Sequence, residues 1–271
     1  MPHTSELTFA DAHNAWHASV EAQRTEPFGP LSATALHWIG AEPEEFPDVP
    51  GLWSASDDGR VTAWFVSADG VTLDGAAAQG TVSLGPLTGS DARVLEWGDR
   101  RIEVAARGGR IALRPRDPGS PVRVRYAGTG TFPADPDWVV TARYVPRTPA
   151  TVEVDSAVPG RTQQQRSPGR AEFTLGETRI ALTLFGDDAA PALQLIFADA
   201  TGADLTFPAA RFVPAVRVDA ETVVIDFNRA VNPPCAYSAS ATCPLPPPEN
   251  RIAVRIEAGE LRPGLRSPSR P

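Results

Sequence analysis

Short runs of alternating hydrophobic and polar residues dominate the chain from residue 60 onward. A period of two is typical of strands, and it is clear in RVTAWFVS at 60–67. Two tight hairpins follow, because Gly98-Asp99 separates ARVLEW from RIEVAA, and Gly108-Gly109 separates RIEVAA from RIALR. Glycine suits the two-residue turns that join such strands. The pattern therefore predicts a three-stranded antiparallel meander over 92–114.

The first part of the chain has a helical period instead. Apolar and aromatic residues recur every three or four positions, at Phe9, Ala12, His13, Trp16 and Val20. Thr8 with Asp11 three residues later can cap a helix, and Pro27 with Gly29 ends it. We expect a second short helical segment at 32–39, so that residues 1–45 form an N-terminal helical cap.

More short strands are expected further along the chain. They are predicted at 122–126, 138–144, 151–154, 171–175, 179–185, 193–197, 222–227 and 251–257. Most of the 28 prolines and 22 glycines lie between them, which is typical of sandwiches and barrels. The predicted fold is mainly β, an antiparallel β-sandwich or barrel with an N-terminal helical segment. We expect one β-rich domain over 1–262 and a flexible tail over 263–271.

The composition excludes several classes of function. The chain has no lysine, so its 25 cationic side chains are all arginine, and Schiff-base or Walker-type chemistry has no lysine to use. A net charge of −8 argues against nucleic-acid binding. No apolar run approaches the roughly 20 residues of a membrane helix, and no secretion signal is visible. We expect a cytoplasmic protein without nucleic-acid or membrane partners, and the oligomeric state stays open.

Residues 223–260 read VVIDFNRAVNPPCAYSASATCPLPPPENRIAVRIEAGE. This run resembles the bacterial and archaeal family of unknown function DUF1684. Three other segments agree with it: WHASVEAQRTEPFGPLSATALHWI at 16–39, RGGRIALRPRDPGSPVRVRYAG at 107–128 and IFADATGADLTFPAARFV at 196–213. The resemblance covers nearly the whole chain, but it implies no established activity.

The segment from residue 226 to 251 is the first candidate site. A predicted strand ends in Asp226 and Asn228 and enters a loop dense in proline. Such a stiff loop is a reasonable place to hold a ligand, although a structural plug that closes a barrel explains it as well. The predicted ligand-binding residues here are Asp226, Asn228, Arg229, Asn232, Cys235, Cys243, Glu249 and Asn250.

The two cysteines of this loop are too few for a disulfide scaffold. A reactive thiol needs a base or a positive neighbour, which Arg229, Arg251 or an N-terminal histidine could supply. Two buried thiols or one disulfide are the favoured interpretation.

An arginine stripe is the second candidate site. Arg110, Arg114 and Arg116 share one strand face, and Arg123 and Arg125 share a face of the next predicted strand. Several guanidinium groups together suit a carboxylate or phosphate ligand. We therefore include Arg110 and Arg114 among the ligand-binding residues. An exposed face neutralised by Glu103 and Asp117 is the favoured alternative.

The histidines all lie in the first 37 residues, at His3, His13, His17 and His37. A spacing of four puts His13 and His17 on one helix face, as two metal ligands would be. Asn14, and not glutamate, follows His13, so the zinc-protease pattern is missing. We expect solvent-facing histidines, and we predict neither a metal nor a cofactor.

The candidate carboxylates are Asp226, Glu249, Glu257 and Glu260. We expect Glu257 and Glu260 to be solvated, whereas Asp226 and Glu249 flank the proline-rich loop. They could serve as acid and base, or each could pair with Arg229 or Arg251. The leading hypothesis is a β-barrel that binds a small anionic or amphipathic metabolite at this loop. The alternatives are a hydrolase or isomerase that uses Asp226 or Cys235, and a protein-interaction module.

Overall fold

The computed structural model describes residues 8–89 and 91–264 of the chain. Backbone contacts divide the chain into two compact units. The barrel unit comprises residues 1–23, 127–237 and 243–271, and the sandwich unit comprises 24–126 and 238–242. The single domain predicted over 1–262 stays a prediction. Of the predicted tail, residues 265–271 lie outside the described part.

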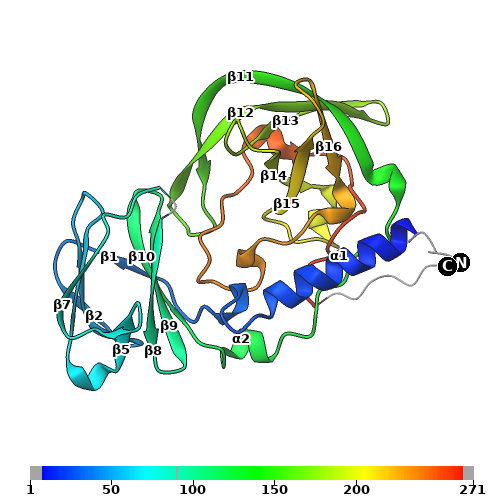
Figure 1. Ribbon diagram of the computed structural model, residues 1–271. Coiled ribbons are helices and arrows are strands. Elements are labelled where there is room, and N and C mark those ends of the chain that lie inside the picture. Colours follow the sequence, from blue (N-terminus) through cyan, green and yellow to red (C-terminus); the bar gives the residue numbers. More distant parts are fainter. Residues whose placement is uncertain (1–7, 90, 265–271) are drawn as a thin grey trace, which may run out of the picture. The chain divides into compact units, whose positions relative to one another are not determined.

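A seven-stranded sheet forms the barrel unit, in the order β13-β12-β11-β16-β15-β14-β17. Its strands are β11 (Val139–Asp155), β12 (Thr162–Leu175), β13 (Thr178–Leu184), β14 (Ala192–Asp199), β15 (Arg211–Arg217), β16 (Thr222–Asp226) and β17 (Arg251–Ile252). Neighbours are antiparallel, except that β17 pairs with β14 in parallel. Phe185 and Gln194 exchange backbone hydrogen bonds of 2.9 and 2.7 Å and so join β13 to β14. The sheet is therefore nearly closed into a barrel (Figure 1).

Alternating residues of these strands fill the barrel with apolar side chains. Leu182, Leu195 and Ile225 are buried, each on a different strand. Phe197 and Phe227 pack edge to face with ring centroids 5.4 Å apart. This dry interior leaves the ends of the barrel as the places for polar groups.

The helix α1 (Phe9–Arg24) begins as predicted. Asp11 N donates to Thr8 Oγ1 at 3.1 Å, and Thr8 N donates to Asp11 Oδ2 at 3.2 Å, which is a capping box. Figure 1 shows α1 running along one end of the barrel. Its inward face carries Trp16, over which the Arg229 guanidinium lies at 5.7 Å. Among the described residues, no helix is long and apolar enough to cross a membrane.

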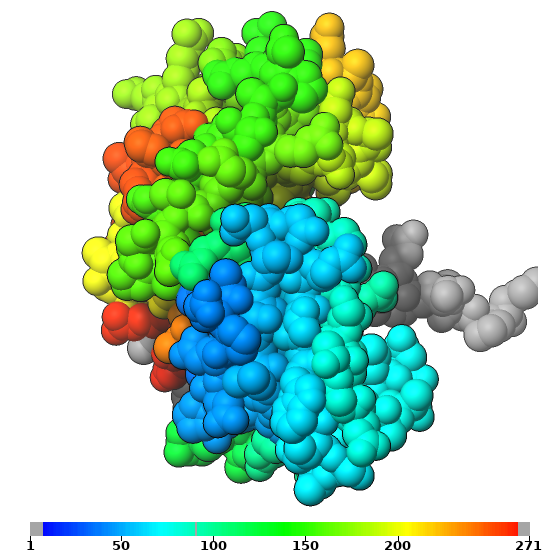
Figure 2. Space-filling model, turned by 90° about the vertical axis from the view of Figure 1, so that its left-hand side faces the viewer, coloured from blue at the N-terminus to red at the C-terminus, as the bar shows by residue number. Residues whose placement is uncertain are grey.

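Two sheets form the sandwich unit, in the orders β1-β10-β9-β8-β5-β6 and β2-β3-β4-β7. The strands are β1 (His37–Ile39), β2 (Glu44–Phe46), β3 (Val49–Ala55), β4 (Val61–Phe65), β5 (Val71–Leu73), β6 (Ala76–Ala77), β7 (Gly80–Leu84), β8 (Ala92–Trp97), β9 (Arg100–Arg107) and β10 (Arg110–Arg116). Trp53, Phe65 and Leu95 are among the side chains of its own core. In Figure 2 the blue and cyan residues of this unit gather into one body.

The predicted meander is confirmed. Trp97 pairs with Arg100, and Arg107 pairs with Arg110, so each hairpin has a two-residue turn. Gly108 and Gly109 both have positive φ, 57° and 73°, as the primed turn requires.

Two sequence predictions are wrong. The second helical segment expected at 32–39 is absent beyond the 3-10 helix η1 (Pro30–Ser32), because Thr34 N donates to Pro115 O and β1 pairs with β10, which uses the backbone groups that a helix would need. The strand predicted at 122–126 is the short helix α2 (Pro121–Val124). Proline suits the first position of a helix, because the backbone N–H that it lacks would have no hydrogen-bond partner within the helix there.

The strand boundaries also differ in two places. The strands expected at 138–144 and 151–154 are parts of β11, whose register shifts between Pro146 and Ala150. The strand expected at 251–257 ends after Ile252, because the carbonyl oxygens of Ile256 and Ala258 accept hydrogen bonds from the Arg211 side chain.

Candidate functional site

The segment 258–261 carries a fully buried glutamate into the barrel unit. Glu260 N donates to Ala230 O at 2.8 Å, and Leu261 N donates to Gly130 O at 2.8 Å. Gly259 has a φ of 79°, and a Cβ atom there would lie 2.5 Å from Ala230 O. Only glycine accepts both the left-handed backbone and this close approach, so Gly259 sets the position of Glu260.

Arg211 of β15 anchors the same segment from inside. Its guanidinium is fully buried, lies 2.7 Å from Asp199 Oδ1, and donates to Ile256 O at 2.9 Å and to Ala258 O. Burial lowers the pKa of Arg211, while the Asp199 carboxylate acts to raise it.

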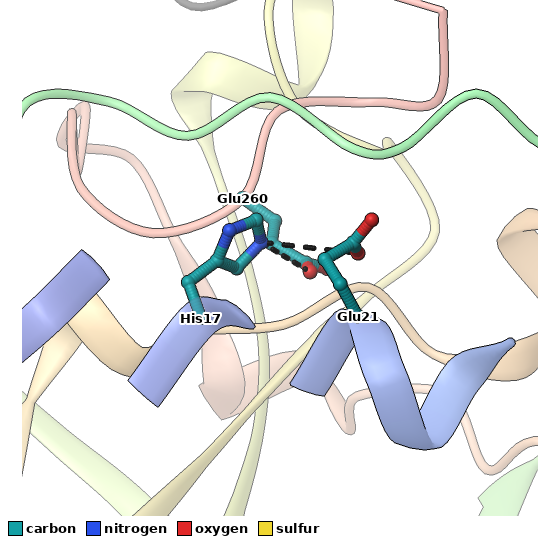
Figure 3. Close-up of side chains that lie close together, drawn as sticks. All are labelled: His17, Glu21 and Glu260. Atoms are coloured by element: carbon teal, nitrogen blue, oxygen red, sulfur yellow. Dashed lines mark hydrogen bonds and ion pairs between the residues drawn. The ribbon is translucent and has the colours of Figure 1, made fainter. Parts of the chain in front are cut away.

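A polar cluster forms where α1 meets this segment (Figure 3). His17 Nε2 lies 3.2 Å from Glu260 Oε1 and 3.9 Å from Glu21 Oε1. His17 and Glu21 are one helical turn apart on α1, and the side chain of Glu260 is buried between them and the barrel. We call this group, together with Thr129, Asn232 and Tyr237, the His17–Glu260 cluster.

The three further members hold the second oxygen of each carboxylate. Glu260 Oε2 accepts from Asn232 N at 2.7 Å and from the Tyr237 hydroxyl at 3.5 Å. Glu21 Oε2 accepts from Thr129 N at 3.2 Å. The oxygen atoms of Thr129 and Tyr237 lie 2.8 Å apart and complete the ring of contacts. Backbone donors thus orient both carboxylates so that their Oε1 atoms face the imidazole.

Several buried polar atoms beside this ring have no hydrogen-bond partner. Asn232 is 4% exposed, and its Oδ1 is unpaired although its Nδ2 donates to Leu261 O at 2.7 Å. His13 is 5% exposed, both of its ring nitrogens are unpaired, and its ring is stacked on His17 with centroids 6.4 Å apart. Burial and the neighbouring His17 lower the pKa of His13. The expectation that the histidines face solvent is therefore wrong for His13, which is buried. His17 is half-buried.

The cluster combines an imidazole, two carboxylates and a phenol. Such groups transfer protons, accept hydrogen bonds from a ligand, or bind a divalent cation. One signal for it was present in the sequence, because His13, His17 and Glu21 follow one another at intervals of four on one helix face. The solvated role expected for Glu260 is wrong, because its side chain is fully buried and only the fold brings it to α1.

Three of the predicted site residues lie together at the end of β16, where each has a local role. Asp226 accepts from Asn228 N at 3.0 Å and lies 3.3 Å from Arg229 Nε. The Asn228 side chain holds Asp135 through its backbone N and O, at 2.9 and 2.8 Å. These bonds fasten the 3-10 helix η5 (Phe227–Arg229) to the loop before β11.

Glu249 and Asn250 are held at the opposite side of the barrel. The Asn250 side chain exchanges two hydrogen bonds with the backbone of Thr183, at 2.8 and 2.9 Å, and donates to Ile196 O at 2.8 Å. Glu249 accepts from Thr183 Oγ1 at 2.7 Å. Thr183 is on β13, and two strands separate β13 from β16 in either direction around the barrel. Asp226 and Glu249 therefore do not share one site.

No disulfide joins Cys235 and Cys243, but the two residues contact each other. Cys235 N donates to Cys243 Sγ at 3.3 Å. The hydrogen bond with Cys243 and burial raise the pKa of Cys235, which is the opposite of what a nucleophilic thiol requires. Of the two favoured interpretations, the structure has the unbridged thiols.

Arg110 and Arg114 lie in the sandwich unit, apart from the other predicted residues. Arg114 lies 3.6 Å from Glu103 Oε1, and Arg116 Nε donates to Glu103 Oε2 at 2.7 Å. Glu103 is buried and pairs with Arg114 and Arg116, which are partly buried, whereas Arg110 is exposed. Arg110 stacks on Trp38 at 5.4 Å and lines a pocket of about 380 Å³.

Comparisons with known proteins give a family and a similar solved structure. No curated protein matches it. A similar solved structure is the NMR structure of an uncharacterized protein from Haloarcula marismortui, 29% identical, with a TM-score of 0.44 over 51% of this chain and 78% of that chain. The model of the family described as protein of unknown function (DUF1684) matches residues 124–261, half of the chain. The chain therefore belongs to the DUF1684 family.

Proposed function

We propose that the barrel unit binds a small polar molecule through the His17–Glu260 cluster. The observation that carries the proposal is the buried and unpaired Oδ1 of Asn232, the residue whose backbone N donates to the buried Glu260 carboxylate. A buried acceptor without a partner costs about 1–3 kcal/mol. Natural proteins keep few such groups, and a functional role is one of the explanations for those that they keep.

The charges of the cluster favour a neutral or cationic ligand with hydrogen-bond donors. Glu21 and Glu260 both direct an oxygen toward His17, and Asn232 Oδ1 adds another acceptor. Arg229, the cation nearest to Trp16, is already paired with Asp226. An anion would be repelled by two carboxylates at close range. The sequence suggested a small anionic or amphipathic metabolite. The charges of the cluster instead favour a neutral or cationic ligand over an anionic one.

Thermal unfolding in the presence of small molecules tests this proposal. The protein is screened at millimolar concentration against amines, neutral polyols and amides, and carboxylates. We expect compounds of the first two classes to raise the Tm of the wild type. A ligand at a hundred times its Kd stabilises by about 2.7 kcal/mol, which corresponds to a rise in Tm of roughly 5–11 °C for a unit of this size.

Two matched carboxylate variants locate the binding. Glu260→Gln removes a carboxylate from the cluster. Glu249→Gln removes the carboxylate that accepts a hydrogen bond from Thr183 of β13. We expect the ligand-induced shift to be lost in Glu260→Gln and kept in Glu249→Gln. Equal shifts in all three proteins, or no shift with any amine, polyol or amide, would contradict the proposal.

A further inference from the structure

We propose that the His17–Glu260 cluster binds one divalent transition metal of the zinc class. The ligands are His17 Nε2 and one oxygen each of Glu21 and Glu260. The inference deepens the proposed function, on which it rests, because it names an ion in the same cluster.

The spacing of the three donor atoms fits such an ion. His17 Nε2 lies 3.2 Å from Glu260 Oε1 and 3.9 Å from Glu21 Oε1, and all three donors lie within 4.8 Å of one another. Zinc binds nitrogen and oxygen at about 2.0–2.2 Å, so two ligands of a tetrahedral site are roughly 3.4 Å apart. The two separations from His17 Nε2, 3.2 and 3.9 Å, lie on either side of this value.

The donor set also selects the class of metal. One imidazole with two carboxylates suits Zn²⁺ and its neighbours better than Mg²⁺ or Ca²⁺, which take oxygen ligands alone. Three protein ligands are the number found in catalytic zinc sites, which leaves a position for water or a small molecule.

The surrounding hydrogen bonds orient the two carboxylates as a metal site requires. Asn232 N and the Tyr237 hydroxyl hold Glu260 Oε2, and Thr129 N holds Glu21 Oε2. Each carboxylate therefore presents its other oxygen toward the imidazole. Metal ligands are usually oriented by outer hydrogen bonds of this kind.

An independent observation inside the cluster points to a bound group. The carboxamide of Asn232 is 4% exposed, and its Nδ2 lies 3.3 Å from the Tyr237 hydroxyl, while its Oδ1 is unpaired. Buried acceptors of this kind are usually satisfied, so this oxygen has the capacity to accept a hydrogen bond from a group bound in the cluster.

A plain imidazole–carboxylate pair exists elsewhere in the protein and serves as a control. In the sandwich unit, His37 Nε2 lies 2.7 Å from Asp48 Oδ1. Among the described residues, no third ligand-type side chain joins that pair into a metal-binding group.

Titration with a metal alone tests the inference on the full-length protein after treatment with a chelator. Zn²⁺ binding is followed by calorimetry, and Co²⁺ binding by the visible absorption of a tetrahedral complex. We expect one metal per chain in the wild type and in His37→Ala. His17→Ala and Glu21→Gln should weaken binding by about tenfold or more, since each loses a ligand.

The controls separate loss of the metal from loss of the fold. Glu21 is only half-buried, so Glu21→Gln should unfold at the wild-type temperature even if a variant of buried Glu260 does not fold. No metal binding by the wild type, unchanged binding in His17→Ala, or equal losses in His37→Ala would overturn the inference. If the chelator-treated protein binds no metal but still shows the ligand-induced rise in Tm that depends on Glu260, the metal inference is wrong and the proposed ligand binding stands. If the protein binds the metal but no organic compound raises its Tm, the metal inference is supported and the proposed binding of a small organic molecule is wrong.

Discussion

At the scale of single residues, Gly259 controls where Glu260 lies. A side chain there would meet Ala230 O at 2.5 Å and would require a left-handed backbone at a φ of 79°. We expect Gly259→Ala to lower the free energy of unfolding by about 1–3 kcal/mol, measured by urea denaturation. Gly264→Ala is the control, because it also has positive φ but has nothing within 4 Å of its Cβ position. A loss no larger than that of the control would show that the close approach does not matter.

The thiols give a second prediction at this scale. Because the hydrogen bond with Cys243 and burial raise the pKa of Cys235, little thiolate is present at neutral pH. We expect iodoacetamide to label the native protein more slowly than the protein in denaturant, as mass spectrometry would show. Fast labelling of Cys235 in the native protein would instead favour the enzyme hypothesis that uses this residue.

Residues with local partners could be predicted from the sequence, whereas residues with distant partners could not. The bond between Thr8 and Asp11 spans three positions and was predicted correctly. His17 and Glu260 are 243 positions apart, and no local pattern joins them. Strand alternation alone did not show that Asp226, at the end of β16, and Glu249, in the 3-10 helix η7 (Pro248–Asn250), lie on opposite sides of the barrel.

At the scale of elements, Asn250 fastens the seam between β13 and β14. Its side chain makes three hydrogen bonds to backbone atoms of these two strands. Asn250→Ala would leave these buried groups unpaired, at about 1–3 kcal/mol each. We expect a loss of at least about 3 kcal/mol in unfolding free energy, and faster hydrogen exchange of the Thr183 amide. A loss below about 1 kcal/mol would show that the seam does not depend on Asn250.

The β9–β10 hairpin gives a prediction for pH dependence. Burial acts to raise the pKa of Glu103, but the charges of Arg114 and Arg116 outweigh it and lower the pKa below its ordinary value of 4.5. The ionised form is therefore more favourable in the folded protein, and its contribution to stability is present above pH 4.5 and is lost as the pH falls below it.

Urea denaturation between pH 3 and pH 7 checks this. We expect Glu103→Gln to be less stable than the wild type at pH 7, by about 3 kcal/mol because it breaks a buried ion pair, and to lose less stability on acidification. Glu44→Gln, an exposed glutamate of the same unit, should follow the wild type. Parallel pH profiles for Glu103→Gln and the wild type would contradict the assignment.

Elements defined by adjacent residues were predicted better than those defined by closure of a sheet. The hairpins of β8, β9 and β10 follow from two-residue glycine turns. The pairing of β1 with β10 joins residues more than 70 positions apart, and no turn signal marks it. The segment 32–39 was therefore assigned a helix from its local spacing alone.

At the scale of the whole molecule, the chain contains two β units with separate cores. The barrel unit draws on three stretches of the chain, which meet at one end in the His17–Glu260 cluster. The mainly β fold was predicted from short strands separated by proline and glycine, and the family from the proline-rich run at 223–260. Membership of DUF1684 assigns no activity, so a function has to be argued from this cluster.

The most direct test of the account is NMR mapping of the ligand that gives the largest Tm shift. The amides of Thr129 and Asn232 donate to carboxylates of the cluster, and the Thr183 amide reports on the β13 seam. We expect the largest shift changes at Thr129 and Asn232, with Thr183 and the Gly109 amide of the sandwich pocket unchanged. Largest changes at Thr183 or Gly109 would contradict the claim that the His17–Glu260 cluster is the binding site.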